Sequence, residues 1–145
     1  MAKSHVTVLI IDPERAHRAL IREHLTAPGV EFKVFESCGE ADGLRLARQQ
    51  KPEAILLEVA SPTGQTWRIL ETLKSEESTR SIPVIVVSIL DEEGKARRLG
   101  ADGYVLKPFN ARTLLHELKR FLPVDGPCDR IRGLSCQVNV TTVTA

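Results

Sequence analysis

The chain has 145 residues, of which 42% are hydrophobic, and its 20 lysines and arginines nearly balance its 19 aspartates and glutamates. This length and composition predict one globular domain. The balanced charge argues against a field that would attract nucleic acid or an anionic membrane, so we expect neither as a partner. The polar start "MAKSH" precedes a short apolar run without a cleavage-site pattern, and we therefore expect a cytoplasmic protein.

Apolar strand-like runs alternate with segments of helical periodicity as far as Pro123. This alternation is typical of a parallel sheet with crossover helices and predicts a doubly wound (βα)5 domain with strand order 2-1-3-4-5. The predicted strands are residues 6–12, 31–38, 54–60, 82–89 and 102–109. The predicted helices are residues 14–25, 39–50, 66–78, 90–101 and 110–122. We expect the fourth helix to be short, because Gly100 stops it.

Local patterns define how some of these elements should pack. The first predicted helix has apolar residues on one face, which we expect to be buried; these are Ala16, Leu20, Ile21 and Leu25. The second predicted strand alternates between apolar and polar residues and should lie near a sheet edge. Asn110 is the predicted N-cap of the last helix, and Trp67 is expected to pack in or near the core.

The chain divides into a domain at residues 1–123 and a tail at residues 124–145. The tail begins with Gly and Pro and then becomes rich in β-formers, so it could be disordered, a strand, or the start of a further region. Its two cysteines, Cys128 and Cys136, could close a small disulfide loop. With Cys38 they make an odd number without zinc-site spacing, and we expect free thiols.

Four polar residues stand at the ends of predicted strands: Asp12, Glu58, Ser88 and Lys107. In a doubly wound sheet these ends meet at one crevice, where ligands bind. Two acids, a hydroxyl and an amine suit either phosphate chemistry or an acid–amine site. Lys107 is followed by Pro108, and a cis peptide bond there would fix the turn that aims the amine.

Residues 6–122 resemble the receiver domain of two-component response regulators. The similar motifs are "VLIIDPE", "PEAILLEVASP", "IPVIVVS" and "LGADGYVLKPF", of which the last is the most specific. The resemblance implies that a histidine kinase phosphorylates an Asp at the place of Glu58 and that acids after the first strand hold Mg²⁺. It also implies that Ser88 and Lys107 contact the phosphoryl group, that Ser88 and Tyr104 form a switch pair, and that Ala60 offers a backbone carbonyl to the metal.

Two departures from the receiver pattern fall on this chemistry. Glu58 replaces the phosphoacceptor Asp, and its extra methylene moves the carboxylate outward. Pro13 replaces the second of two successive acids and cannot coordinate a cation. Mg²⁺ binding is therefore expected to be weakened, with Glu14 as a partial substitute, and we expect no other cofactor. Ile89 is bulkier than the residue usual at its position and should narrow the route for a phosphodonor.

Several residues allow two interpretations. Glu58 is either a structural acid paired with Lys107, in a permanently active-like arrangement, or a working phosphoacceptor. Asp12 is either a partner for Lys107 and the N-cap of the first helix, with Pro13 at the first helical position, or a metal ligand. Four histidines lie among polar neighbours and are expected to be solvated; they are His5, His17, His24 and His116.

The sequence thus predicts a flavodoxin-like α/β receiver module of a bacterial two-component phosphorelay. We expect this pseudo-receiver to be degenerate at Glu58, to act by protein–protein interaction and not to be an enzyme. A histidine kinase or another signalling protein is the expected partner, and the face of the fourth helix, fifth strand and fifth helix could form a homodimer. One alternative is a conventional phospho-accepting receiver. Another is a small α/β hydrolase or nucleotide binder, although neither a glycine-rich phosphate loop nor a GxSxG elbow is present.

Overall fold

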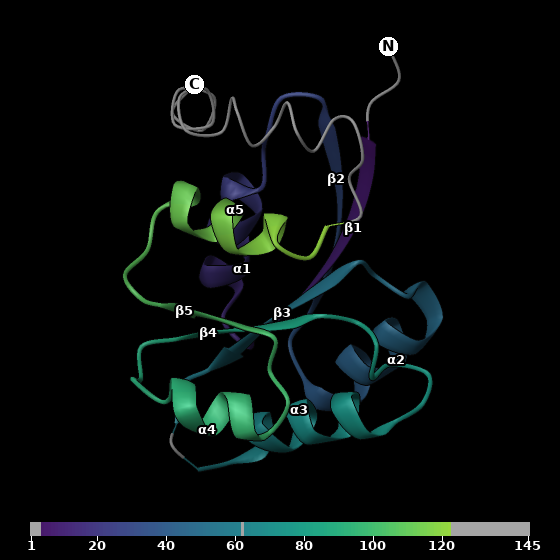
Figure 1. Cartoon of the computed structure of the whole chain (residues 1–145), viewed down its shortest axis with the longest axis vertical. Helices are drawn as coiled ribbons and strands as arrows, with labels where there is room; N and C mark the ends of the chain where they lie inside the picture. Colours follow the sequence, from purple (N-terminus) through teal and green to yellow (C-terminus); the bar gives the residue numbers. More distant parts are fainter. Residues whose placement is uncertain (1–3, 62, 123–145) are drawn as a thin grey trace.

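The computed structural model describes residues 4–61 and 63–122, which form a five-stranded sheet with helices on both faces (Figure 1). The strand order is β2-β1-β3-β4-β5, and every neighbouring pair is parallel. The strands are β1 (Ser4–Ile11), β2 (Val30–Ser37), β3 (Ala54–Val59), β4 (Val84–Ser88) and β5 (Gly103–Leu106). The predicted flavodoxin-like doubly wound α/β fold is confirmed.

Five helices connect and follow the strands. They are α1 (Arg15–His24), α2 (Glu40–Gln50), α3 (Gln65–Ser75), α4 (Glu93–Arg98) and α5 (Ala111–Lys119). Helices α1 and α5 cover one face of the sheet, and α2, α3 and α4 cover the other (Figure 1). The prediction of a short fourth helix is confirmed, since α4 has six residues. Gly100, two residues later, has a φ of 104°, a left-handed conformation that favours glycine and ends the helix.

The core has two halves, one on each side of the sheet. Alternate residues of β1 serve different halves: Val8 and Ile10 pack under α1 and α5, whereas Leu9 and Ile11 pack under α2 and α3. All residues of β3 and β4 are buried, which explains why their sequences are apolar runs without a polar face. The edge strand β2 has a mixed burial pattern, as its alternating sequence predicts.

Two local predictions are confirmed. The Asn110 side chain accepts a hydrogen bond of 2.9 Å from the backbone N–H of Thr113 and so caps α5. Trp67 is buried, and its indole Nε1 donates to the Ser61 carbonyl at 2.9 Å. This bond ties the start of the loop after β3 to the first turn of α3.

The prediction that the apolar face of α1 is buried is wrong for two of its four residues. Ile21 and Leu25 are buried, but Ala16 is exposed and Leu20 is 47% exposed. Leu20 therefore lines a surface groove, described below.

The predictions for the tail at residues 124–145, including a Cys128–Cys136 disulfide and the boundary at Pro123, lie outside the described residues. Cys38 is an exposed free thiol, as expected. Within residues 4–61 and 63–122, no helix is both long and apolar enough to cross a membrane.

Candidate functional site

The four polar residues at the strand ends lie at one edge of the sheet. Asp12 directly follows β1, Lys107 directly follows β5, and Val59, the residue after Glu58, pairs in register with Ser88. The structure brings the side chains of Asp12, Glu58 and Lys107 together. The Ser88 side chain instead bonds to the backbone.

Glu58 and Lys107 form an ion pair in which Nζ lies 2.5 Å from Oε1. The Glu58 side chain is 5% exposed and that of Lys107 is 15% exposed. The Lys107 ammonium is the charged partner of the buried Oε1. Burial raises the pKa of Glu58 above its ordinary value of 4.5, and the Asp12 charge adds to this effect, whereas Lys107 and His17 oppose it. Lys107 therefore only partly offsets the cost of burying the ionised carboxylate.

Asp12 is fully buried, and its two carboxylate oxygens differ in their surroundings. Oδ1 accepts the backbone N–H of Glu14 at 2.8 Å, while Oδ2 accepts no hydrogen bond from the described part of the chain. The prediction that Asp12 pairs with Lys107 and caps α1 is wrong. Its nearest basic neighbour is His17, and α1 begins at Arg15 with Glu14 at the N-cap, because Asp12 holds the Glu14 N–H in a tight turn before the helix starts.

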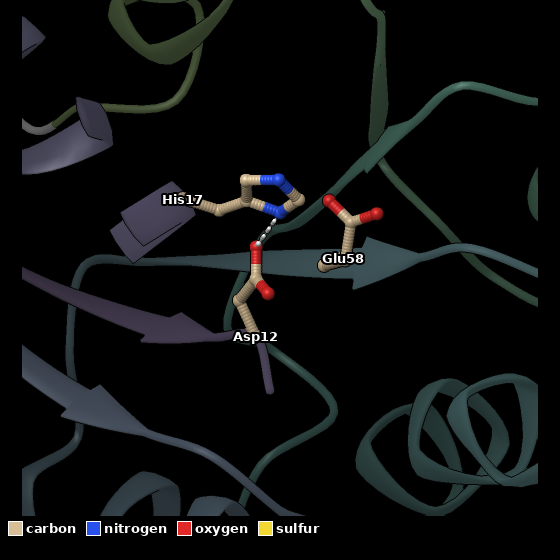
Figure 2. Close-up of side chains that lie close together, drawn as sticks. All are labelled: Asp12, His17 and Glu58. Atoms are coloured by element: carbon tan, nitrogen blue, oxygen red, sulfur yellow. Dashed lines mark ion pairs between the residues drawn. The ribbon is translucent and has the colours of Figure 1, made fainter. Parts of the chain in front are cut away.

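His17 is the site residue that sequence reasoning missed. Its Nδ1 lies 3.6 Å from Asp12 Oδ2 and 3.4 Å from Lys107 Nζ, and the side chain is 46% exposed. Figure 2 shows the imidazole pointing from α1 toward the two carboxylates. His17 is exposed, as expected for a solvated histidine, but its position beside Asp12 and Lys107 was not predicted. The available signal was its position in the first turn of the helix that follows the Asp12 loop.

The hydroxyls of Ser88 and Tyr104 both bind the backbone around the end of β4. Ser88 is fully buried, donates to the Val59 carbonyl and accepts the Leu90 N–H at 2.9 Å. Tyr104 donates to the Leu90 carbonyl and accepts the Glu92 N–H at 3.2 Å. These bonds connect the end of β3 to the β4–α4 loop and then to β5. The switch role of the pair stays a prediction.

An apolar groove of about 380 Å³ adjoins the ionic cluster. Its lining residues are His17, Leu20, Ile21, Ile89, Lys107, Pro108 and Phe109. The Lys107–Pro108 peptide bond is cis, as anticipated. Ile89 is 62% exposed and stands beside Lys107 in this groove, where it was expected to narrow access; its effect on a phosphodonor stays a prediction.

Comparison with known proteins identifies the family. The model of the response regulator receiver domain matches residues 8–119. The chain belongs to the receiver domain family. Protein PilH of Pseudomonas aeruginosa is 30% identical to this receiver over 118 residues, which cover 79% of this chain and 96% of PilH. The phosphate regulon transcriptional regulatory protein PhoB of the same organism is 34% identical over 126 residues; these cover 85% of this chain but only 54% of PhoB, so this receiver spans about half of PhoB.

Solved structures show the same fold. Chemotaxis response regulator CheY4 of Vibrio cholerae superposes on this receiver with a TM-score of 0.69 at 22% identity. The superposition covers 82% of this receiver and 100% of the CheY4 chain. The receiver domain of the sensor histidine kinase PA1611 of Pseudomonas aeruginosa has a TM-score of 0.69 at 21% identity, with 81% and 98% of the two chains covered. That PA1611 structure has a magnesium ion coordinated in its active-site cleft.

Receiver domains bind Mg²⁺ at the acidic edge of the sheet, and two carboxylates suited to a cation are present here, on Asp12 and Glu58. The rest of the donor set does not match. Pro13 has no side-chain oxygen, the exposed Glu14 is not part of the cluster, and the third donor in reach is the nitrogen of His17. Mg²⁺ prefers oxygen ligands in near-octahedral geometry. The donor set therefore fits Mg²⁺ less well than a site with oxygen ligands alone, and both the weakened binding of Mg²⁺ and the metal contact of the Ala60 carbonyl stay predictions.

Proposed function

We propose that this receiver is a degenerate signalling module of a bacterial two-component phosphorelay, in which Glu58 does not accept a phosphoryl group. The observation that carries the proposal is the buried ion pair between Glu58 Oε1 and Lys107 Nζ, 2.5 Å apart. The residue at the phosphoacceptor position is already bound to the residue that would contact the phosphoryl group. The module then acts by protein–protein interaction rather than by turnover.

Two features of the site argue that phosphoryl transfer to Glu58 is slow. A nucleophile has to sit within about half an ångström of its productive position, and the extra methylene of Glu displaces the carboxylate by more than that. Pro13 also removes an acid that would hold a cation, and cations neutralise the charge that develops during phosphoryl transfer. Both changes disfavour phosphorylation at Glu58 and leave the other residues of the site in place.

The surroundings of Glu58 support a fixed signalling state. In a conventional receiver Lys107 would contact the phosphoryl group; here it contacts a carboxylate. The Ser88 and Tyr104 hydroxyls are both bonded to the β4–α4 loop, so the residues that resemble the switch pair hold this loop in one arrangement. We propose that partner proteins bind this arrangement of the β4–α4 loop without prior phosphorylation.

The proposed partners are a histidine kinase or another signalling protein, and the face formed by α4, β5 and α5 is the proposed homodimer surface. Leu106 of β5 is 47% exposed and Tyr104 is partly buried on this face. Light scattering of the wild type and Leu106→Glu tests the surface. A concentration-dependent dimer that Leu106→Glu dissociates supports it, and a monomer at all concentrations excludes it.

Phosphorylation itself is tested by incubating the full chain with Mg²⁺ and acetyl phosphate and recording intact mass. We expect no phosphoryl adduct on the wild type. Glu58→Asp, alone and combined with Pro13→Asp, separates the two defects: labelling of the single variant shows that only the nucleophile was lost, whereas labelling of the double variant alone shows that Pro13 was also decisive.

A stoichiometric adduct on the wild type that disappears in Glu58→Gln overturns the proposal in favour of a conventional receiver. Beryllofluoride titration followed by Trp67 fluorescence provides an independent reading, because Trp67 lies in the first turn of α3, after the loop that follows β3. The wild type should respond less than the Glu58→Asp/Pro13→Asp variant.

A further inference from the structure

Three side chains with metal-binding atoms meet at the edge of the sheet. Asp12, His17 and Glu58 come from the end of β1, the first turn of α1 and β3, and they point toward one another (Figure 2). One ligand atom of each lies within 4.8 Å of the other two. Asp12 Oδ2 is buried within this cluster without a hydrogen bond from the described residues, so one oxygen is available for a further ligand.

The charges of the cluster are not balanced by the protein. Asp12 and Glu58 contribute two negative charges, and Lys107 supplies one positive charge when His17 is neutral. Arg18 does not supply the second, because it pairs with Glu36 and donates to the Asp12 backbone carbonyl at 2.6 Å. Buried charges are costly unless they are paired or coordinate a metal. A divalent cation would balance both carboxylates.

The donor atoms select a particular class of cation. Carboxylate oxygens suit Mg²⁺, Ca²⁺ and Mn²⁺, whereas an imidazole nitrogen suits Zn²⁺, Cu²⁺, Ni²⁺ and iron. A site with one imidazole and two carboxylates has the three protein ligands of an open zinc site, which leaves a fourth position for water. His17 thus distinguishes this cluster from an all-oxygen magnesium site.

We propose that Asp12, His17 and Glu58 bind a divalent transition-metal ion, with Zn²⁺ the best-matched, in place of the Lys107 ammonium. Two ligands of a tetrahedral Zn²⁺ lie about 3.4 Å apart when each is about 2.1 Å from the metal. The distance from Asp12 Oδ2 to His17 Nδ1 is already 3.6 Å. The Glu58 ligand atom lies within 4.8 Å of the other two and has to move inward on metal binding.

Lys107 competes directly with the metal. Its Nζ lies 2.5 Å from Glu58 Oε1 and 3.4 Å from His17 Nδ1, so the ammonium lies against two of the three ligands. Metal binding therefore frees Lys107 from Glu58. This proposal does not depend on whether Glu58 accepts a phosphoryl group, because metal binding is measured without a phosphodonor.

The test uses the untagged full chain, since a histidine tag would bind the same metals. Cys38, Cys128 and Cys136 are replaced by Ser, because free thiols also bind Zn²⁺. After treatment with a chelator, the protein is titrated calorimetrically with Zn²⁺, Co²⁺ and Mg²⁺, and the visible absorption of Co²⁺ reports the ligand geometry. We expect Zn²⁺ to bind at least about 100-fold more tightly than Mg²⁺. Tighter binding of Mg²⁺ overturns the proposal.

Variants assign the ligands. Even an outer-shell partner of a metal ligand is worth about 10- to 100-fold in affinity, so His17→Ala should weaken Zn²⁺ at least about tenfold and leave Mg²⁺ unchanged. The exposed His116 on α5 is the matched control, and His116→Ala should change neither affinity. Lys107→Met should strengthen Zn²⁺ binding by removing the competitor. Unchanged Zn²⁺ affinity in both His17→Ala and Glu58→Gln, with folding verified by circular dichroism, would falsify the site.

Discussion

Lys107 Nζ and Glu58 Oε1 lie 2.5 Å apart, and neither side chain is more than 15% exposed. Both groups lose hydration in this position, and their mutual attraction offsets much of that cost. Glu58 lies in β3 and Lys107 directly follows β5, so the pair also links segments that are far apart in the sequence. The first two predictions concern this pair.

Replacing Lys107 by Met should lower the free energy of unfolding by about 3 kcal/mol near neutral pH, because it leaves a buried carboxylate without its positive partner. Urea denaturation in the presence of a chelator measures the change. The Glu58→Gln/Lys107→Met double variant is the control, since it removes both charges and should recover most of the loss. A double variant as unstable as the single one would show that the effect comes from lost packing of the lysine side chain.

The raised pKa of Glu58 predicts a pH dependence of stability. Between the ordinary value of 4.5 and the raised value, the folded protein holds the Glu58 proton more tightly than the unfolded chain does. The free energy of unfolding that Glu58 contributes therefore falls as the pH rises through this window. Urea denaturation from acidic to neutral pH should show Glu58→Gln gaining stability relative to the wild type as the pH rises. Parallel curves for the two proteins contradict the assignment.

Ser88→Ala should lower the free energy of unfolding by about 1–3 kcal/mol, because it leaves a buried carbonyl and a partly buried N–H without their hydroxyl partner. The Ser88 hydroxyl donates a hydrogen bond to the Val59 carbonyl and accepts one from the Leu90 N–H. Ser75→Ala is the matched control, since its hydroxyl bonds to the Thr72 carbonyl on the exposed end of α3 and its loss should cost little. Hydrogen exchange adds a local reading: exchange of the Leu90 amide should accelerate. Unchanged protection there would exclude the structural role of Ser88.

Gly100→Ala should destabilise the fold by about 2 kcal/mol or more, from backbone strain and from overpacking together. Gly100 has a φ of 104°, and a Cβ there would lie 2.9 Å from Lys74 Cγ. Lys74 cannot move freely, because it pairs with Asp102 at 2.9 Å. Gly29→Ala is the control for backbone strain alone, because Gly29 has a φ of 78° and nothing lies within 4 Å of the added Cβ. Thermal unfolding should show a smaller loss of stability for Gly29→Ala than for Gly100→Ala. Equal losses at both positions would exclude the Lys74 contact as a cause.

Most of the fold could be predicted from the sequence because its signals are local. A strand covered on both faces has no polar face, so the apolar runs that lead to Glu58 in β3 and Ser88 in β4 identify central strands. Gly100 marks the end of α4 through its backbone conformation alone. The positions of Asp12, Glu58 and Lys107 at one edge follow from the parallel order of their strands.

The partners within the site could not be predicted, because they depend on where α1 begins. A helix starting at Pro13 would have used Asp12 as its cap; the observed start at Arg15 puts His17 in the first turn, against Asp12. Periodicity identifies the apolar face of α1 but not where the sheet stops beneath it, so the exposure of Leu20 was also missed. The first error arises from a two-residue difference in the start of α1, which side-chain type does not determine.

The groove beside the cluster has a thermodynamic consequence. His17 and Lys107 line the groove and also belong to the ionic cluster, so any molecule seated in the groove changes the hydration of both. A ligand of the cluster and an occupant of the groove must then alter each other's affinity by the same factor, in whichever order they bind. This factor can be measured as the change in affinity of either molecule when the other is bound. Binding to the ionic cluster therefore reports whether the groove is occupied.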